Sequence, residues 1–309
     1  MTAPRAVAVA VGPAVAAALA DGRPVVALES AIITHGLPRP LNREVARELE
    51  DRLRAEGVIP ATVGVIDGVA TVGLSPAELE QLAATTGDVA KASVRDLPVV
   101  MVRRGAAGTT VAATAWLAHH VGIRVFATGG IGGVHRGADH TFDESADLPT
   151  LARTPIAVVC AGVKSILDVP ATLERLETLG VVVLGYRTRS FPGFYVADSG
   201  EEIAVSVSGP EEVAAVMGLV QELGLPGAVV VANPVPPAEQ LDPAVHDAVI
   251  AEAMAVAAAR GIRGPALTPF LLDRLRQATG GASVAANLAA VRHNVAVAGA
   301  IARAWADRG

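Results

Sequence analysis

Short apolar runs, often rich in β-branched residues, alternate along this chain with longer segments of helical periodicity. The expected strands cover residues 24–28, 61–66, 99–102, 124–127, 156–161, 181–185 and 228–232. The expected helices cover residues 11–19, 42–56, 76–85, 112–120, 172–179, 210–223, 243–260 and 283–306. This alternation predicts an α/β fold, a three-layer α/β/α sandwich around a largely parallel sheet.

The composition favours a folded enzyme-sized unit. Of 309 residues, 51% are hydrophobic and 18% are charged, which allows a large core and excludes extensive disorder. No repeat or linker composition interrupts the chain, so we expect one catalytic domain over residues 1–309. A net charge of −6 argues against general nucleic-acid binding. The single cysteine, Cys160, lies in an apolar run and predicts a buried thiol in a reducing cytoplasm.

The N-terminus allows two interpretations. Arg5 followed by an apolar run resembles a short signal peptide. The interruption at Gly12-Pro13 and the stop at Asp21-Gly22 instead favour a first helix over residues 11–19 of a cytoplasmic protein. We expect no membrane partner, because no apolar stretch reaches the roughly 20 residues of a membrane span. Further along, Asn42 is expected to cap the helix over 42–56.

Polar clusters follow several of the expected strands directly. They are Glu29-Ser30, Asp67-Gly68, Thr128-Gly129-Gly130 and Gly162-Val163-Lys164. In open parallel sheets, ligands bind outside the carboxyl ends of the strands. We therefore expect these clusters to lie along one edge of the sheet.

Lys164 and Glu29 are the residues whose chemistry stands out in these clusters. A lysine that leaves a buried strand is expected to have a lowered pKa, which makes the amine a nucleophile able to form a Schiff base. The alternative is a loop lysine paired with Asp168. Glu29, beside apolar neighbours, is a candidate general acid, and a structural salt bridge is its alternative.

The segment from 127 to 147 contains four glycines within five residues. Such a run lets the backbone approach a ligand and turn N–H groups toward an anion. The spacing fits neither a dinucleotide fingerprint nor a Walker A loop. His135, Arg136 and His140 supply positive charge suited to phosphate.

Two further segments have the residue types of ligand sites. Asp143, Ser145 and Asp147 offer hard oxygen ligands for Mg²⁺ or Mn²⁺, or are solvated loop acids. Lys91, with a hydroxyl and a guanidinium nearby in residues 93–95, is a plausible phosphate clamp. Residues 108–111 precede a helix and offer its N-terminus to an anion, or contain only a helix cap. Together these features indicate an enzyme acting on a small phosphorylated molecule.

Several strings also resemble the pseudouridine-5′-phosphate glycosidase family, which is related to indigoidine synthase A. They are VVALES at 25–30, THGLP at 34–38, PATVGVIDG at 60–68, SVRDLP at 93–98, FATGGIGGVHRGADHTFDESADL at 126–148, VVCAGVKSILDVPATLERLET at 158–178, VVANP at 230–234 and TPFLL at 268–272. The resemblance runs from about residue 13 to the C-terminus.

The resemblance implies a lyase-type glycosidase of nucleotide metabolism and pseudouridine catabolism. Such an enzyme reversibly cleaves the C–C glycosidic bond of pseudouridine 5′-phosphate to uracil and ribose 5-phosphate. It also implies that Lys164 attacks the anomeric carbon to form an imine, with Glu29 as proton donor and Asp143 anchoring Mn²⁺. The substrate site would be lined by Lys91, Val111, Ser145, Ala146, Asp147 and His135, with Asn287 facing the base. A cytoplasmic homotrimer is implied as well.

Three alternatives stay open. A biosynthetic C-glycosynthase would run the reaction in reverse, joining ribose 5-phosphate to another aromatic acceptor. A non-catalytic sugar-phosphate sensor would have no need of both Lys164 and Glu29. A nucleotide-dependent oxidoreductase would require a different glycine spacing.

Overall fold

The computed structural model describes residues 9–308 except 86, 88 and 263–266. The chain divides into two compact units. Unit 1 comprises Met1–Phe126 and Gly299–Gly309, and unit 2 comprises Ala127–Ala298. The prediction of one catalytic domain over 1–309 stays a prediction. Arg5, on which the signal-peptide interpretation depends, lies outside the described residues.

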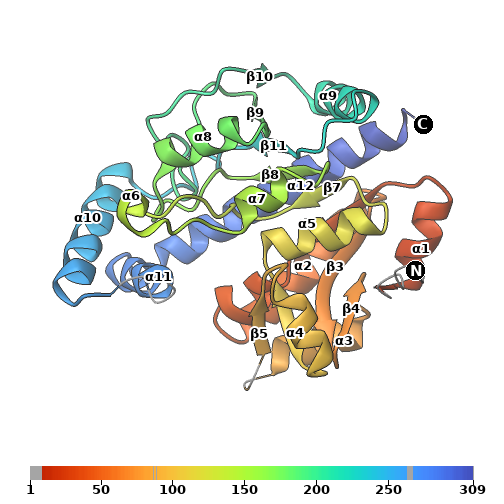
Figure 1. Cartoon of the computed structure of the whole chain (residues 1–309), viewed down its shortest axis with the longest axis horizontal. Coiled ribbons are helices and arrows are strands. Elements are labelled where there is room, and N and C mark those ends of the chain that lie inside the picture. The colour runs from red at the N-terminus through yellow and green to blue at the C-terminus, as the bar shows by residue number, and fades with distance from the viewer. Residues whose placement is uncertain (1–8, 86, 88, 263–266, 309) are drawn as a thin grey trace, which may run out of the picture. The chain divides into compact units, whose positions relative to one another are not determined.

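The sheet of unit 1 is mixed (Figure 1). Its strands are β1 Ala10–Val11, β2 Val25–Leu28, β3 Ile59–Ile66, β4 Val69–Val72, β5 Val89–Ala92 and β6 Ala106–Thr109. β1 and β4 pair in parallel, β2 and β3 pair in parallel, and β5 and β6 pair in parallel. β3 pairs antiparallel with both β4 and β6. β2 is buried along its whole length and β3 along nearly all of it, as expected for strands covered on both faces.

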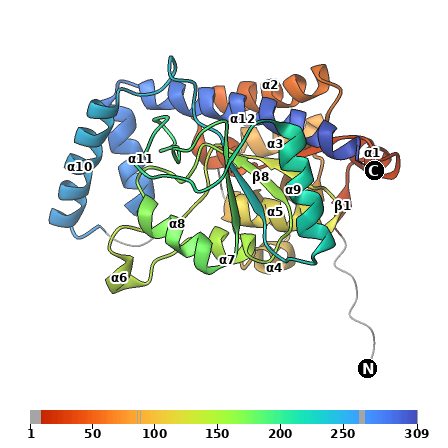
Figure 2. The same ribbon diagram turned by 90° about the horizontal axis from the view of Figure 1, so that it is seen from above.

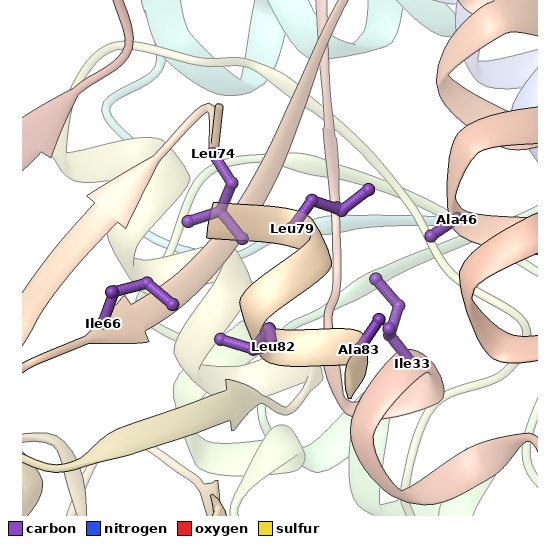
Figure 3. Packing of buried hydrophobic residues seen from close by; sticks show 7 residues of the cluster. All are labelled: Ile33, Ala46, Ile66, Leu74, Leu79, Leu82 and Ala83. Atoms are coloured by element: carbon purple, nitrogen blue, oxygen red, sulfur yellow. The ribbon is translucent and has the colours of Figure 1, made fainter. Parts of the chain in front are cut away.

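The helices of unit 1 follow from capping and from apolar periodicity. They are α1 Pro13–Ala20, the π-helical turn η1 Ile32–Gly36, α2 Leu41–Ala55, α3 Pro76–Ala84, α4 Leu97–Val102 and α5 Val111–His120. A capping box between Ser75 and Glu78 starts α3. Figure 3 shows how α3 places Leu79, Leu82 and Ala83 in a cluster with side chains from η1, α2 and β3. This core holds the segment that follows β2.

The sheet of unit 2 is parallel in all its described strand pairs. Its strands are β8 Ala157–Cys160, β9 Val182–Tyr186, β10 Ser206–Val207 and β11 Val229–Ala232. β11 lies between β8 and β9, and β10 pairs with β9. β7 Val125–Ala127 ends in this unit, and the next residue, Thr128, donates its N–H to Val159 O at 3.0 Å. β8 and β11 are fully buried, so their carboxyl ends lead directly from the core to the polar segments.

Helices of unit 2 cover this sheet and extend beyond it. They are α6 Ala138–Thr141, α7 Asp147–Leu151, α8 Val169–Thr178, α9 Pro210–Glu222, α10 Pro243–Ala259, α11 Leu267–Ala278 and α12 Ala282–Ala306, which ends in unit 1. α10 and α11 lie side by side as a helical hairpin (Figures 1 and 2). Among the described residues, only α12 is long and apolar enough to cross a membrane, but 61% of its most apolar window is buried inside the protein.

The predicted α/β class, with largely parallel strands and helices on both sides, is confirmed. The strand expected at 99–102 is wrong, because this run is part of α4. Leu97 and Val100 are buried three residues apart, whereas Val102 is 85% exposed, which is a helical pattern. The expected cap is also wrong. α2 begins after Pro40, and the Asn42 amide donates to Ile33 O and Ala83 O.

Candidate functional site

Lys164 follows β8 on a segment that is held by a backbone ladder. Ala161 N–H donates to Gly129 O at 2.9 Å, and Lys164 N–H donates to Ile131 O at 3.2 Å. The glycine-rich segment after β7 therefore runs alongside the segment after β8, and the predicted placement of Lys164 after a buried strand is confirmed. Lys164 itself is partly exposed. The carboxylate of Asp168 accepts the Ala171 N–H and caps α8.

Asp147 is held against the glycine-rich segment. Its Oδ2 accepts the Gly132 N–H at 2.8 Å, and its own N–H donates to Ser145 Oγ at 3.2 Å. A Cβ at position 132 would lie 2.2 Å from Ser145 Oγ, so only glycine fits there. The structure thus brings together Gly132, Ser145 and Asp147, whereas Ala146 is exposed beside them.

Asp143 and His135 lie together at the base of a loop. His135 N–H donates to Asp143 O at 3.0 Å, and His135 Nδ1 lies 3.9 Å from Asp143 Oδ2. The Asp147 carboxylate accepts the Gly132 N–H instead. Among the residues that the structure describes, no three His, Cys, Asp or Glu side chains form a metal-ligand group. A cation at Asp143 would need water for most of its ligands.

Arg136 and His140 are exposed on the same loop. His140 Nε2 lies 3.3 Å from Asp139 Oδ2. Their expected role at a phosphate stays a prediction.

Asn287 lies beside the glycine turn from helix α12. Its Oδ1 is buried, has no hydrogen-bond partner, and lies 3.1 Å from the position of a Cβ at Gly129. Two further amides support this turn, and sequence reasoning assigned them no role. Asn294 Nδ2 donates to Thr128 O at 2.8 Å, and Asn233 Nδ2 donates to Asn294 Oδ1 at 2.9 Å. Asn233 follows an apolar run and stands out in the sequence, whereas Asn294 follows Arg292 and His293 and does not.

In unit 1, the ends of β5 and β6 place two unpartnered hydroxyls next to a helix N-terminus. Lys91 is opposite Gly108 in this parallel pair, and Thr110 N–H donates to Ala92 O at 3.0 Å. Ser93 Oγ and Thr110 Oγ1 are both buried without a hydrogen-bond partner. Val111 begins α5, and Thr110 makes no side-chain cap there. Thr110 is the N-cap residue of α5, but its hydroxyl makes no capping hydrogen bond, so its side chain and the first N–H groups of α5 are donors suited to an anion.

Glu29 is positioned through its neighbour Ser30. The buried Ser30 Oγ donates to Val63 O at 2.6 Å and accepts the Thr109 N–H at 3.0 Å. Thr109 Oγ1 donates to the same Val63 carbonyl at 2.8 Å. This network ties the end of β2 to the end of β6, so Glu29 and residues 109–111 are fixed relative to each other.

Glu29 also borders a small pocket whose other lining is largely apolar. The lining includes Leu28, Ile32, Ile33, Leu37, Asn42, Val45, Ala46, Leu49 and Thr62. Nearby, burial and the positive charge of Lys91 lower the pKa of His35, whose Nδ1 lies 2.7 Å from Thr34 Oγ1. His35 is therefore neutral at pH 7 and adds no charge to this side of the unit.

Comparisons with known proteins agree on one family. The model of indigoidine synthase A-like proteins matches residues 14–304. Pseudouridine-5′-phosphate glycosidase of Saccharopolyspora erythraea is 60% identical over 94% of this chain and 95% of its own length. The corresponding protein of Frankia alni is 60% identical over 94% of this chain and 80% of its own length.

Two solved structures share the fold at 36% identity. The prealnumycin C-glycosynthase AlnA, in complex with ribulose 5-phosphate, has a TM-score of 0.91 and covers 99% of both chains. An indigoidine synthase A-like protein of Thermotoga maritima has a TM-score of 0.83 and covers 91% of this chain and 92% of its own. With its motifs, its fold and these similarities taken together, the chain belongs to the family of indigoidine synthase A-like proteins.

Proposed function

We propose that this protein is a pseudouridine-5′-phosphate glycosidase, an enzyme that reversibly cleaves the substrate to uracil and ribose 5-phosphate. The observation that carries this proposal is the 60% identity to a protein of that name over 94% of this chain and 95% of the relative. At that identity and coverage, the similarity extends over nearly the full length of both proteins. The side chains described above supply the groups that this reaction requires.

The phosphate is bound at the ends of β5 and β6. Ser93 Oγ and Thr110 Oγ1 are buried without partners, and a phosphate oxygen would supply the missing hydrogen bonds. The first amides of α5, from Val111 onward, add N–H donors and the positive end of the helix dipole. The exposed ammonium of Lys91 supplies a full charge.

We assign the sugar and the base to a second group of residues. Lys164, held on the ladder beside Ile131, presents the amine. The segment Ser145-Ala146-Asp147, fixed to Gly132, lines the substrate site together with His135. Asn287 Oδ1, which is buried without a partner, accepts a hydrogen bond from an N–H of the uracil ring.

The reaction proceeds through an imine with Lys164. Glu29 protonates the ring oxygen as the Lys164 amine attacks C1′, so the C1′–O bond breaks and a C–N bond forms. The attached Lys164 nitrogen, now an ammonium, gives up a proton, which restores its lone pair, and uracil C5 takes up a proton. The nitrogen lone pair forms the C=N bond as the C1′–C5 bond breaks and uracil departs. Addition of water to the imine releases ribose 5-phosphate and restores the amine.

This route suits a C-glycoside better than two-carboxylate hydrolysis does. Carbon C5 is a poor leaving group until it is protonated, and the neighbouring nitrogen supplies the electrons that expel it. One difficult bond cleavage becomes a series of easier steps.

A divalent cation such as Mn²⁺ would be held by Asp143, with His135 as a nearby nitrogen donor. One carboxylate and one imidazole fit the oxygen and nitrogen preferences of Mn²⁺. The 3.9 Å separation of His135 Nδ1 and Asp143 Oδ2 leaves these two atoms outside direct hydrogen-bond distance. When bound, the ion would supply Lewis acidity and ordered water. Its presence is tested by metal analysis of the purified protein and by Mn²⁺ titration of wild type against Asp143→Ala.

A cytoplasmic location and a homotrimeric assembly belong to the same proposal. The single cysteine is buried, as in proteins that rely on no disulfide. Light scattering after size exclusion measures the assembly directly, and three times the monomer mass of 31.3 kDa is expected.

Release of uracil from pseudouridine 5′-phosphate in the presence of Mn²⁺ tests the function. Wild type should release one uracil per substrate, and Lys164→Ala and Glu29→Gln should lose at least about 100-fold in rate, as typical for a covalent nucleophile or a general acid. Glu80→Gln is the matched control, since Glu80 is a partly exposed carboxylate that forms ion pairs with Arg43 and Arg47. If folded, metal-loaded wild type released no uracil, the proposed glycosidase function would be contradicted.

The second candidate is a C-glycosynthase that joins ribose 5-phosphate to another aromatic acceptor. The similarity to AlnA over 99% of both chains favours it as the alternative. A protein that forms a lysine adduct with ribose 5-phosphate but does not release uracil from pseudouridine 5′-phosphate would support this candidate.

A further inference from the structure

Ser165, the residue that follows Lys164, has a buried hydroxyl without a partner. The residue is only 5% exposed, and its Oγ makes no hydrogen bond. A hydroxyl taken out of water without a new partner costs free energy, and most buried polar groups in proteins have one. An alanine would avoid this cost, so the serine at this position calls for a ligand that supplies the bond.

Unpartnered buried atoms of this kind coincide with the proposed substrate site. Among the described residues, the other such atoms are Ser93 Oγ, Thr110 Oγ1, His246 Nε2 and Asn287 Oδ1. Three of these four belong to segments to which the proposed function assigns the substrate. A polar group whose hydrogen-bond partner is a ligand is buried and unpartnered in the protein alone. Ser165 shares the property and directly adjoins the nucleophile.

The backbone fixes Ser165 beside Lys164. Lys164 N–H donates to Ile131 O at 3.2 Å, and Lys164 O accepts the Leu167 N–H at 2.9 Å. Residues 164–167 therefore form a tight turn with Ser165 in its second position. Ile166 and Leu167 are 2% and 3% exposed, which anchors the turn in the core.

We propose that the Ser165 hydroxyl binds a hydroxyl group of the ring-opened sugar phosphate attached to Lys164. This inference rests on the proposed function, and it adds a substrate-contacting residue for the same reaction. An open-chain sugar is flexible, and each fixed hydroxyl reduces the entropy lost on reaching the reactive geometry. The turn holds Ser165 directly after Lys164, the residue of covalent attachment. Ser165 takes part in no bond-breaking step.

The test is the rate at which ribose 5-phosphate becomes trapped on the protein by cyanoborohydride, followed by intact mass. Ser165→Ala should lower this rate about tenfold, the effect of one lost hydrogen bond to a substrate. Its melting temperature should equal or exceed that of wild type, because an unpartnered polar atom has been removed. Ser165→Cys has a similar volume and a weak donor, and should also be slow.

Thr154→Val is the matched control. The buried Thr154 hydroxyl has a partner, since it donates to Thr150 O at 2.8 Å. This variant should melt at a lower temperature and trap the sugar at the wild-type rate.

Equal trapping rates for wild type and Ser165→Ala would overturn the inference and leave the lysine mechanism intact. A slow Ser165→Ala whose rate is restored by Ser165→Cys would also overturn it, because the side chain would then matter only for packing. Wild type that traps no sugar would instead overturn the proposed imine mechanism itself, and this inference with it.

Discussion

Replacing Gly132 by alanine should disrupt the candidate site through its effect on Asp147. A Cβ at position 132 would lie 2.2 Å from Ser145 Oγ, 2.6 Å from Ser145 Cβ and 2.7 Å from Asp147 Oδ2. Overpacking of this kind costs about 1–3 kcal/mol. Loss of the 2.8 Å bond between Gly132 N–H and the Asp147 carboxylate costs about 1.5–3 kcal/mol more. We expect a total destabilisation of about 2.5–6 kcal/mol and a loss of uracil release.

Urea unfolding followed by circular dichroism measures this change. Gly105→Ala is the matched control, because a Cβ there would meet Val100 Cγ1 at 3.6 Å, an ordinary contact. The control should differ from wild type by less than about 1 kcal/mol. If Gly132→Ala behaved like the control in both stability and activity, the close packing of the glycine turn against Asp147 would be refuted.

Three further outcomes are expected. Burial raises the pKa of the Cys160 thiol to about 12, so Ellman's reagent should react only after denaturation; rapid reaction of native protein would contradict this burial. Asn294→Ala removes the hydrogen bonds to the Asn233 amide and to Thr128 O and should lower the unfolding free energy by about 2–4 kcal/mol in urea titrations, with an unchanged value as the contrary result. Burial and Arg124 lower the pKa of His119, so the unfolded state binds its proton more readily; stability should fall as pH drops below about 6.5, and His119→Gln should lessen that slope.

The sequence predicted those parts of the fold in which local pattern and burial agree. β2, β8 and β11 are continuous apolar runs buried on both faces, and each lies where it was expected. β5 and β6 were not predicted, because the sequences VAKA and AAGT lack the β-branched run of a strand. They form because they pair with each other and β6 pairs with β3, which is a tertiary effect.

The residue types of the candidate site could be predicted from the sequence, but the hydrogen bonds that hold these residues in place could not. Lys164 and Glu29 were recognisable because each follows a buried strand. Asn294 was not recognised, since its partners Asn233 and Thr128 are 61 and 166 residues away in the chain. A local sequence pattern carries no information about partners that are so far apart in the chain.

The spacing of Asp143, Ser145 and Asp147 left two interpretations open in the sequence. Their oxygens suited either a hard metal ion or a solvated acidic loop. The chain instead directs Asp147 to the Gly132 N–H and places Asp143 beside His135.

The central claim is that Lys164 forms an imine with the sugar phosphate. The chain contains two lysines, Lys91 and Lys164, so the site of attachment is simple to assign. Protein is mixed with ribose 5-phosphate and reduced with borohydride. The adduct is measured by intact-protein mass spectrometry and located by peptide mapping, with Lys164→Ala and Lys91→Arg treated in parallel. We predict one ribose phosphate on the Lys164 peptide of wild type and of Lys91→Arg, and none on Lys164→Ala. An adduct that persists in Lys164→Ala, or its absence from folded wild type, would contradict the account.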